Sequence, residues 1–164
     1  MTGRIVGLLL VALLCAATTG CSLGGNSTPA LSSLEPAVSP DGRRLAYESA
    51  VEQRLKLFVR DLSTGVSEQI TDGTSDDFSP AWSPDGGSLV FASNREKGNV
   101  DIYTIDVASR QLRRVTTDAG NDMYPAWSTN GRIYFNSDRT KAWQVYSILP
   151  DGSDATVVVA NPAP

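Results

Sequence analysis

The sequence predicts an all-β fold made of three four-stranded antiparallel blades. Three segments share one pattern of turn residues, and their opening prolines, Pro36, Pro80 and Pro125, stand 44 and 45 residues apart. Repeats of this length are typical of β-propeller blades or of helix-pair solenoids. No window has apolar residues at i, i+3, i+4 and i+7 over a dozen positions, and Gly or Pro interrupts every candidate helix. The pattern therefore favours strands.

Each repeat contains four short apolar runs separated by turn residues. The first run of each repeat opens the motif at its proline. The second run is rich in β-branched and aromatic residues, as strands prefer, and the third run repeats this composition. The second runs are 44–49, 88–93 and 132–137, the third runs are 57–61, 102–106 and 145–148, and the fourth runs end at Ile70, at Val115 and near Val158. The sequence thus predicts twelve strands in all.

The turn between the first two runs of the second repeat is Pro84-Asp85-Gly86. Proline sets φ at the first corner, the Asp85 side chain can bond to nearby backbone, and Gly86 can take a left-handed conformation. Gly131 has the corresponding place in the third repeat. Trp82 and Trp127 recur at one fixed position of the repeat, so we expect them to pack between neighbouring blades and not to stack on a ligand.

The same residues resemble the repeat of TolB-type β-propellers. The resemblance lies in segments 80–86, 91–95 and 101–106 and in Val115-Thr116, and it covers about 35–159. It implies blades of a ring that closes with six, so three repeats would form half of a six-bladed ring. Val38 in the tryptophan position of the first copy, and Thr129-Asn130 in place of Pro-Asp in the third, suggest terminal units.

Three blades would leave two apolar sheet faces uncovered. We expect a homodimer that closes a six-bladed ring, with Leu45 and Tyr47 of the first blade and Tyr146 of the third near the junction. The alternatives are a partner protein that supplies the missing blades, an open three-blade wedge, or a shortened gene product.

The first 20 residues are predicted to be a signal peptide. Arg4 precedes an apolar run over 5–17, and small residues follow before Cys21. The pattern resembles a bacterial lipoprotein signal, which implies lipidation of Cys21; an ordinary secretory signal is the alternative. Residues 21–34 then form a flexible tether. The expected blades are about 35–78, 79–123 and 124–164, and the expected location is the outer side of a cell membrane, or the outer membrane where the cell has one.

Composition excludes several classes of function. The formal charge is −4 and no basic cluster occurs, so nucleic acid is not an expected partner. The sequence has no histidine, and both of its cysteines lie in the first 21 residues. It also lacks a G-x-S-x-G elbow and a phosphate-binding glycine loop. We therefore predict no enzymatic activity and no cofactor or metal.

Strand geometry places the longer, charged loops on one face, since the loops after the second and fourth strands of a meander emerge together. The candidate binding face comprises Asp76, Asp77, Arg95, Asp122, Asp138 and Arg139. Either Arg95 and Arg139 pair with aspartates of an adjacent blade, or they contact a ligand. The predicted function is a protein-interaction scaffold at the cell envelope. The alternatives are a surface sensor for a small ligand or for Ca²⁺, through the acidic loops, and an incomplete propeller that works only after dimerisation.

Overall fold

The computed structural model describes residues 35–160 apart from residue 97. The predicted signal peptide, Cys21 and the tether lie outside the described residues. No helix occurs in the described part of the chain, and that part accordingly offers no helical segment that could cross a membrane.

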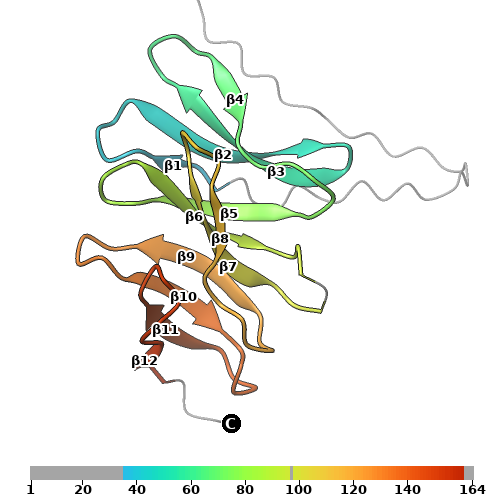
Figure 1. The fold of residues 1–164 in the computed structure, drawn as a ribbon, viewed down its shortest axis with the longest axis vertical. Helices are drawn as coiled ribbons and strands as arrows, with labels where there is room; N and C mark the ends of the chain where they lie inside the picture. The colour runs from blue at the N-terminus through green and yellow to red at the C-terminus, as the bar shows by residue number, and fades with distance from the viewer. Residues whose placement is uncertain (1–34, 97, 161–164) are drawn as a thin grey trace, which may run out of the picture. The chain divides into compact units, whose positions relative to one another are not determined.

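Twelve strands form three separate antiparallel sheets of four strands each (Figure 1). The first sheet contains β1 (Ala37–Val38), β2 (Arg44–Val51), β3 (Arg54–Asp61) and β4 (Ser67–Gln69). The second contains β5 (Asp77–Trp82), β6 (Ser88–Ser93), β7 (Asp101–Asp106) and β8 (Leu112–Arg114). The third contains β9 (Asp122–Trp127), β10 (Ile133–Ser137), β11 (Gln144–Ile148) and β12 (Thr156–Val159). Strands follow one another in chain order across every sheet, which confirms the predicted all-β meander of three blades.

The second and third sheets begin slightly earlier than the predicted blade limits. Asp77 and Phe78 belong to β5, and Asp122 and Met123 belong to β9. The expected limits at residues 79 and 124 would have placed these four residues in the preceding blades. The opening strands of the second and third sheets thus each carry an aspartate three residues before the repeated proline.

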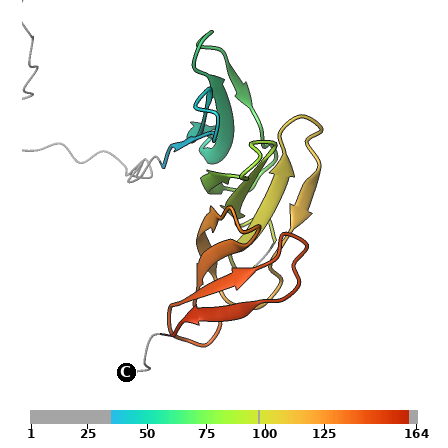
Figure 2. The same cartoon turned by 90° about the vertical axis from the view of Figure 1, so that its left-hand side faces the viewer.

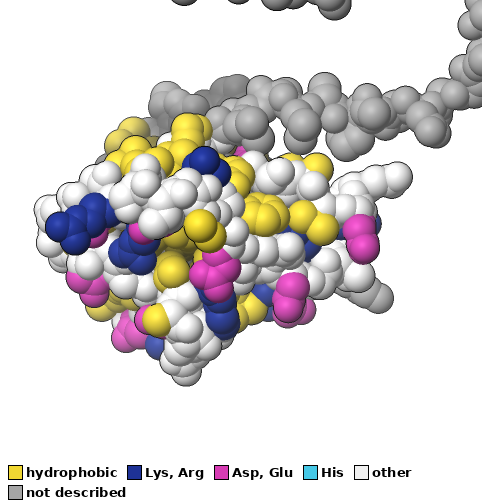
Figure 3. Space-filling view, turned by 90° about the horizontal axis from the view of Figure 1, so that it is seen from above, with side chains coloured by type: hydrophobic (Ala, Val, Ile, Leu, Met, Phe, Trp, Pro, Cys, Tyr) yellow, Lys and Arg dark blue, Asp and Glu magenta, His cyan; other side chains and the backbone are white. Residues whose placement is uncertain are grey.

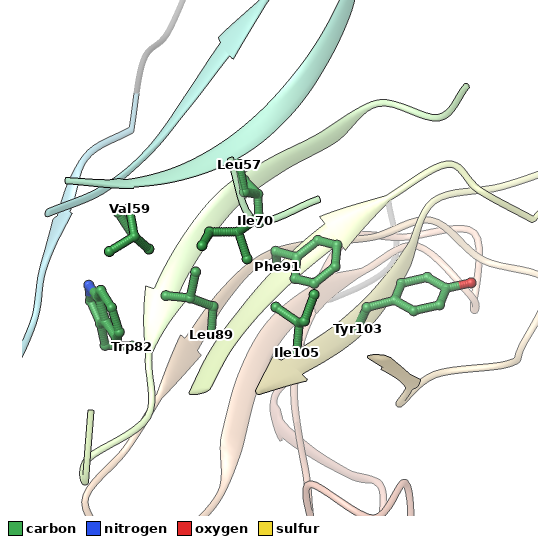
Figure 4. Close-up of a cluster of buried hydrophobic side chains, with 9 residues drawn as sticks. Leu57, Val59, Ile70, Trp82, Leu89, Phe91, Tyr103 and Ile105 are labelled. Atoms are coloured by element: carbon green, nitrogen blue, oxygen red, sulfur yellow. The ribbon is translucent and has the colours of Figure 1, made fainter. Parts of the chain in front are cut away.

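The first junction, which we define as the contact between the first and second sheets, contains one apolar cluster. Leu57 and Val59 of β3 face Leu89 and Phe91 of β6, and Trp82 closes one end (Figure 4). Alternate residues of a strand point to opposite faces, so these side chains use one face of each sheet. The hydroxyl oxygen of Tyr103 points away from the cluster (Figure 4).

The second junction, between the second and third sheets, uses the other face of the second sheet. Val90 and Ile102 pack there against Ile133, Phe135 and Tyr146 of the third sheet. The second sheet is therefore buried on both faces, and the sheets follow one another in order (Figure 2).

The first sheet turns its other face away from the second sheet. Leu45, Tyr47 and Phe58 alternate with the cluster residues and are half-buried. Figure 3 shows hydrophobic side chains near the middle of this end of the molecule, with charged groups around them. Tyr146 does not belong to an equivalent open face. It is 6% exposed and packs in the second junction, so its predicted place at a dimer contact was wrong, because its position in β11 points toward the second sheet.

The opening strands of the second and third sheets are irregular. Their pairing with β6 and β10 shifts register near Ser79 and Tyr124, and both residues have a positive φ. The Ser79 amide donates to Oε2 of buried Glu48 at 2.8 Å. A side chain of the first sheet therefore holds the bulge of the second.

Candidate functional site

The candidate binding face is built around two arginines that follow equivalent strands. β6 ends at Ser93 and β10 ends at Ser137, and Arg95 and Arg139 come two residues later. Arg95 Nε donates to Ser93 Oγ at 3.0 Å, and Arg139 Nε donates to Ser137 Oγ at 2.8 Å. Each serine therefore fixes the guanidinium group close to its own sheet.

An aromatic pair lies under each guanidinium. Phe91 and Tyr103 stack with centroids 6.0 Å apart, and the Arg95 guanidinium carbon lies 4.8 Å from the Tyr103 centroid. Phe135 and Tyr146 stack at 5.9 Å, with Arg139 at 4.3 Å from the Tyr146 centroid. Cation–π attraction adds to the serine hydrogen bonds. Tyr47 and Phe58 form a similar pair in the first sheet at 5.6 Å.

Asp77 is the charged centre of the first junction. Its side chain is fully buried and lies 2.7 Å from Arg95 Nη2 and 3.4 Å from Lys56 Nζ. Ser93 Oγ donates to it at 2.6 Å. Lys56, only 2% exposed, also donates to the backbone carbonyls of Asp72 and Ser75. Burial of the lysine is tolerated because each of these contacts is a hydrogen bond or ion pair.

Asp122 has the corresponding position in the second junction. Arg139 Nη2 lies 3.1 Å from Asp122 Oδ1 and 2.7 Å from Asp118 Oδ2. Burial raises the pKa of Asp122 to about 6, despite the lowering effect of hydrogen bonds and of Arg139. Asp101 of β7 is also fully buried, and Arg114 Nη2 lies 2.7 Å from it. Burial raises the pKa of this carboxyl as well.

The predicted pairing with an aspartate of an adjacent blade is found for Arg139 and not for Arg95. Asp77 and Arg95 belong to the same sheet, so the expectation that Arg95 pairs with an adjacent blade was wrong. Arg139 pairs both with Asp122 of its own sheet and with Asp118, which follows β8 of the preceding sheet. The opening strand begins early enough to bring its own aspartate beneath the arginine.

The remaining two predicted site residues stabilise loops. Asp76 accepts from Asn94 Nδ2 at 2.9 Å and from Arg54 Nη1 at 3.0 Å. Asp138 accepts from the side chain and amide of Asn121 at 3.0 and 2.6 Å, and these bonds lower its pKa. All six residues thus lie at the two junctions, three at each.

Sequence reasoning missed Lys56 and Asp101. They occupy one position of the repeat, two residues before the aromatic residue of the third strand, and Gln144 occupies it in the third sheet. Alignment of the three copies could have revealed this varying charge. No group of three or more Asp, Glu, Cys or His residues in 35–160, residue 97 aside, has the arrangement of a metal site.

The repeated turn positions lie on the opposite face. Asp85 accepts from Ser83 Oγ at 2.6 Å and from the Gly87 amide at 2.9 Å. Gly86 and Gly131 have φ of 72° and 84°, which glycine adopts without steric cost. Trp82 is buried at the first junction, and Trp127 is half-buried against the second.

Comparison with known proteins identifies the family. The sequence model of the TolB β-propeller domain family matches residues 25–162. This chain belongs to the TolB β-propeller family. Among curated proteins, it is 34% identical to an uncharacterized protein of Agrobacterium fabrum, Atu1656, over 71% of this chain and 40% of that protein. It is also 34% identical to the Tol-Pal system protein TolB of Gluconobacter oxydans, over 51% of this chain and 18% of that one.

Solved structures show the same propeller fold. TolB from Acinetobacter baumannii is 33% identical with a TM-score of 0.69, and the match covers 76% of this TolB-family chain and 31% of that structure. Puromycin hydrolase matches with a TM-score of 0.64 at 19% identity, over 76% and 21% of the two chains. At that identity the likeness concerns the fold alone. The chain spans less than half the length of the curated relatives described above.

Proposed function

We propose that this TolB-family chain is a non-enzymatic, extracytoplasmic lipoprotein that binds another envelope protein through the loops around its two junctions. The observation that carries the proposal is the pair of anchored guanidinium groups on neighbouring sheets. Serine hydrogen bonds, aromatic stacking and aspartate ion pairs hold each of them in one position. A charged surface that is already ordered loses little conformational entropy when a partner binds.

The chemistry of these residues supports binding more than catalysis. The sequence contains no histidine, and the buried aspartates of the junctions are engaged by Lys56, Arg95, Arg114 or Arg139. A general base needs a carboxylate or imidazole within reach of the substrate proton. The TolB proteins among the relatives favour an interaction role, while puromycin hydrolase, similar in fold, is named as an enzyme.

The location rests on Cys21. An apolar segment followed by small residues and cysteine supports lipidation there and export across the cell membrane. Wild-type protein should incorporate labelled fatty acid, and Cys21→Ser should lose the label and leave the membrane fraction. Release of wild-type protein with a mature N-terminus other than Cys21 would contradict the anchor.

A second copy of the chain is the proposed cover for the outward face of the first sheet. Leu45, Tyr47 and Phe58 form a half-buried apolar surface there, and burial of such a surface favours association. Sedimentation of the purified chain in detergent should give a dimer, and Tyr47→Glu should give a monomer. A wild-type monomer at micromolar concentration would disprove this assembly.

Site-specific photo-crosslinking in cells tests the binding surface. Photoreactive residues would replace Asn94 and Thr140, which are exposed beside the two arginines, and Asp85 and Asn130, which are exposed in the opposite turns. The proposal predicts a discrete crosslinked partner protein from the first two positions and none from the control positions. Crosslinks from the turns alone would place the interface on the other face and reject the proposed surface.

A further inference from the structure

A cavity of about 280 Å³ opens between the outer strands of the first two sheets. Ile70, Ile105 and Leu112 give it an apolar part, and Arg95 and Arg110 give it two guanidinium groups. The partner of Arg110 is Glu68, which is 71% exposed. The cavity therefore combines a cationic wall with a small hydrophobic surface, a composition that suits an amphiphilic anion.

The second junction shows which groups contact the equivalent arginine, Arg139. Two carboxylates contact Arg139, from Asp122 beneath it and from Asp118 of the preceding sheet. The segments 70–77 and 115–122 align without a gap, and this alignment places Gly73 at the position of Asp118. Arg95 consequently has the first carboxylate, from Asp77, and no counterpart of the second among the described residues.

The first junction also has fewer carboxylates for its cations. Lys56 and Arg95 share the single carboxylate of Asp77, whereas Arg139 alone has two carboxylates. Asp72 lines the cavity, but its carboxylate makes no hydrogen bond or ion pair with a described residue, and only its backbone carbonyl accepts from Lys56. The position beside Arg95 is thus complementary to an added carboxylate.

We propose that this cavity binds the carboxylate of a ligand that carries a small branched apolar group. The carboxylate would contact Arg95 as Asp118 contacts Arg139, and the apolar group would lie against Ile105 and Leu112. Both a free short-chain acid and the C-terminal residue of a peptide have this chemistry. The inference deepens the proposed binding role by naming the recognised group.

Ligand-observed NMR titration of the whole purified chain in mild detergent tests the proposal. The probes are N-acetyl-leucine, which represents a peptide C-terminus, 4-methylpentanoate, which represents a free acid, and N-acetyl-leucinamide, which lacks the charge. We expect the acids to bind with Kd of about 1 mM and the amide to bind at least about tenfold more weakly. The stronger of the two acids identifies the source of the carboxylate.

Two substitutions should move the affinity in opposite directions. Arg95→Gln should weaken acid binding about tenfold, and Asp72→Asn should tighten it because a nearby negative charge is removed. Arg139→Gln is the matched control and should leave acid binding unchanged. Gly73→Asp retains Arg95 and should block the acids by placing a carboxylate at the position that aligns with Asp118, which contacts Arg139. This variant keeps the test valid if Arg95→Gln fails to fold.

Equal affinity for acid and amide, unchanged affinity in both Arg95→Gln and Gly73→Asp, or no acid binding up to about 10 mM would overturn the proposal. These measurements need no envelope protein. If the acids do not bind, only the carboxylate proposal is rejected. The photo-crosslinking experiment still tests the interaction role independently.

Discussion

The two junctions share one architecture and differ in their buried charges. In each, an arginine stacks on an aromatic pair and contacts the opening aspartate of its own sheet. The first junction adds the cation Lys56 at the repeat position where the second adds the anion Asp101. The same backbone positions thus accept opposite charges, because the surrounding residues supply carbonyls to the lysine and Arg114 to the aspartate.

The largest expected effect follows removal of the carboxylate in the first junction. Asp77→Asn leaves Lys56 buried without its anion, and the free energy of unfolding should fall by about 3–5 kcal/mol. Urea titration measures the loss, and Lys56→Met in the same chain should restore most of it. Asp122→Asn is the comparison, since Asp118 still neutralises Arg139. Equal losses at Asp77 and Asp122 would remove the proposed difference between the junctions.

The two tryptophans should also separate the junctions. Trp82 is 6% exposed, donates to the Ala37 carbonyl at 2.9 Å and has the Arg44 guanidinium over its ring. Trp82→Ala should cost about 3–5 kcal/mol, and Trp127→Ala should cost less because its side chain is only half-buried. The denaturant midpoints of the two variants measure this difference in stability. A greater loss from Trp127→Ala would contradict the burial argument.

The second junction should make stability depend on pH near neutrality. The pKa of Asp122 is about 6 in the folded state against 3.8 for an unperturbed aspartate. Between pH 3.8 and about 6 the folded state therefore binds more protons than the unfolded state. The stability that the Asp122 carboxyl contributes is fully present below pH 3.8 and is lost as the pH rises through about 6. Between pH 5 and pH 7, the free energy of unfolding should fall more in wild type than in Asp122→Asn. Parallel slopes would exclude this carboxyl as the source.

The smallest expected effect concerns two tyrosine hydroxyls. The Tyr103 hydroxyl is buried without a hydrogen-bond partner among the described residues, whereas the Tyr146 hydroxyl donates to Gln144 Oε1 at 3.1 Å. Tyr103→Phe removes an unsatisfied polar group and should stabilise the protein by about 1 kcal/mol. Tyr146→Phe should instead be slightly destabilising. Thermal melts of the two variants, which lose the same atom, provide the measurement.

The repeat itself made most of the fold predictable. Pro80, Trp82 and Gly86 recur at a fixed interval, and turn chemistry with β-branched runs is enough to locate strands. The direction of Tyr146 was not predicted correctly, because a one-residue difference in register exchanges the two faces of a strand. The predicted start of the second blade lies two residues after the start of β5, since Asp77 and Phe78 precede the proline motif on which the limits were based.

The candidate site was predictable only as a set of loops. Arg95 and Asp77 could be assigned to one face from strand order, but their contact depends on the geometry of two side chains 18 residues apart in sequence. Lys56 had no recognisable signal by itself, because a lysine within an apolar strand usually faces solvent. Its burial depends on carbonyl groups of a loop whose path no local pattern specifies.

The hydrogen bond between Glu48 and the Ser79 amide also provides a natural probe of sheet separation. The donor lies in the bulge of β5 and the acceptor lies in β2, and both residues are buried. Solvent deuterium can reach this amide only when the first sheet lifts away or the whole domain unfolds. The exchange rate of a single nitrogen-bound hydrogen therefore reports how often the first sheet detaches from the other two.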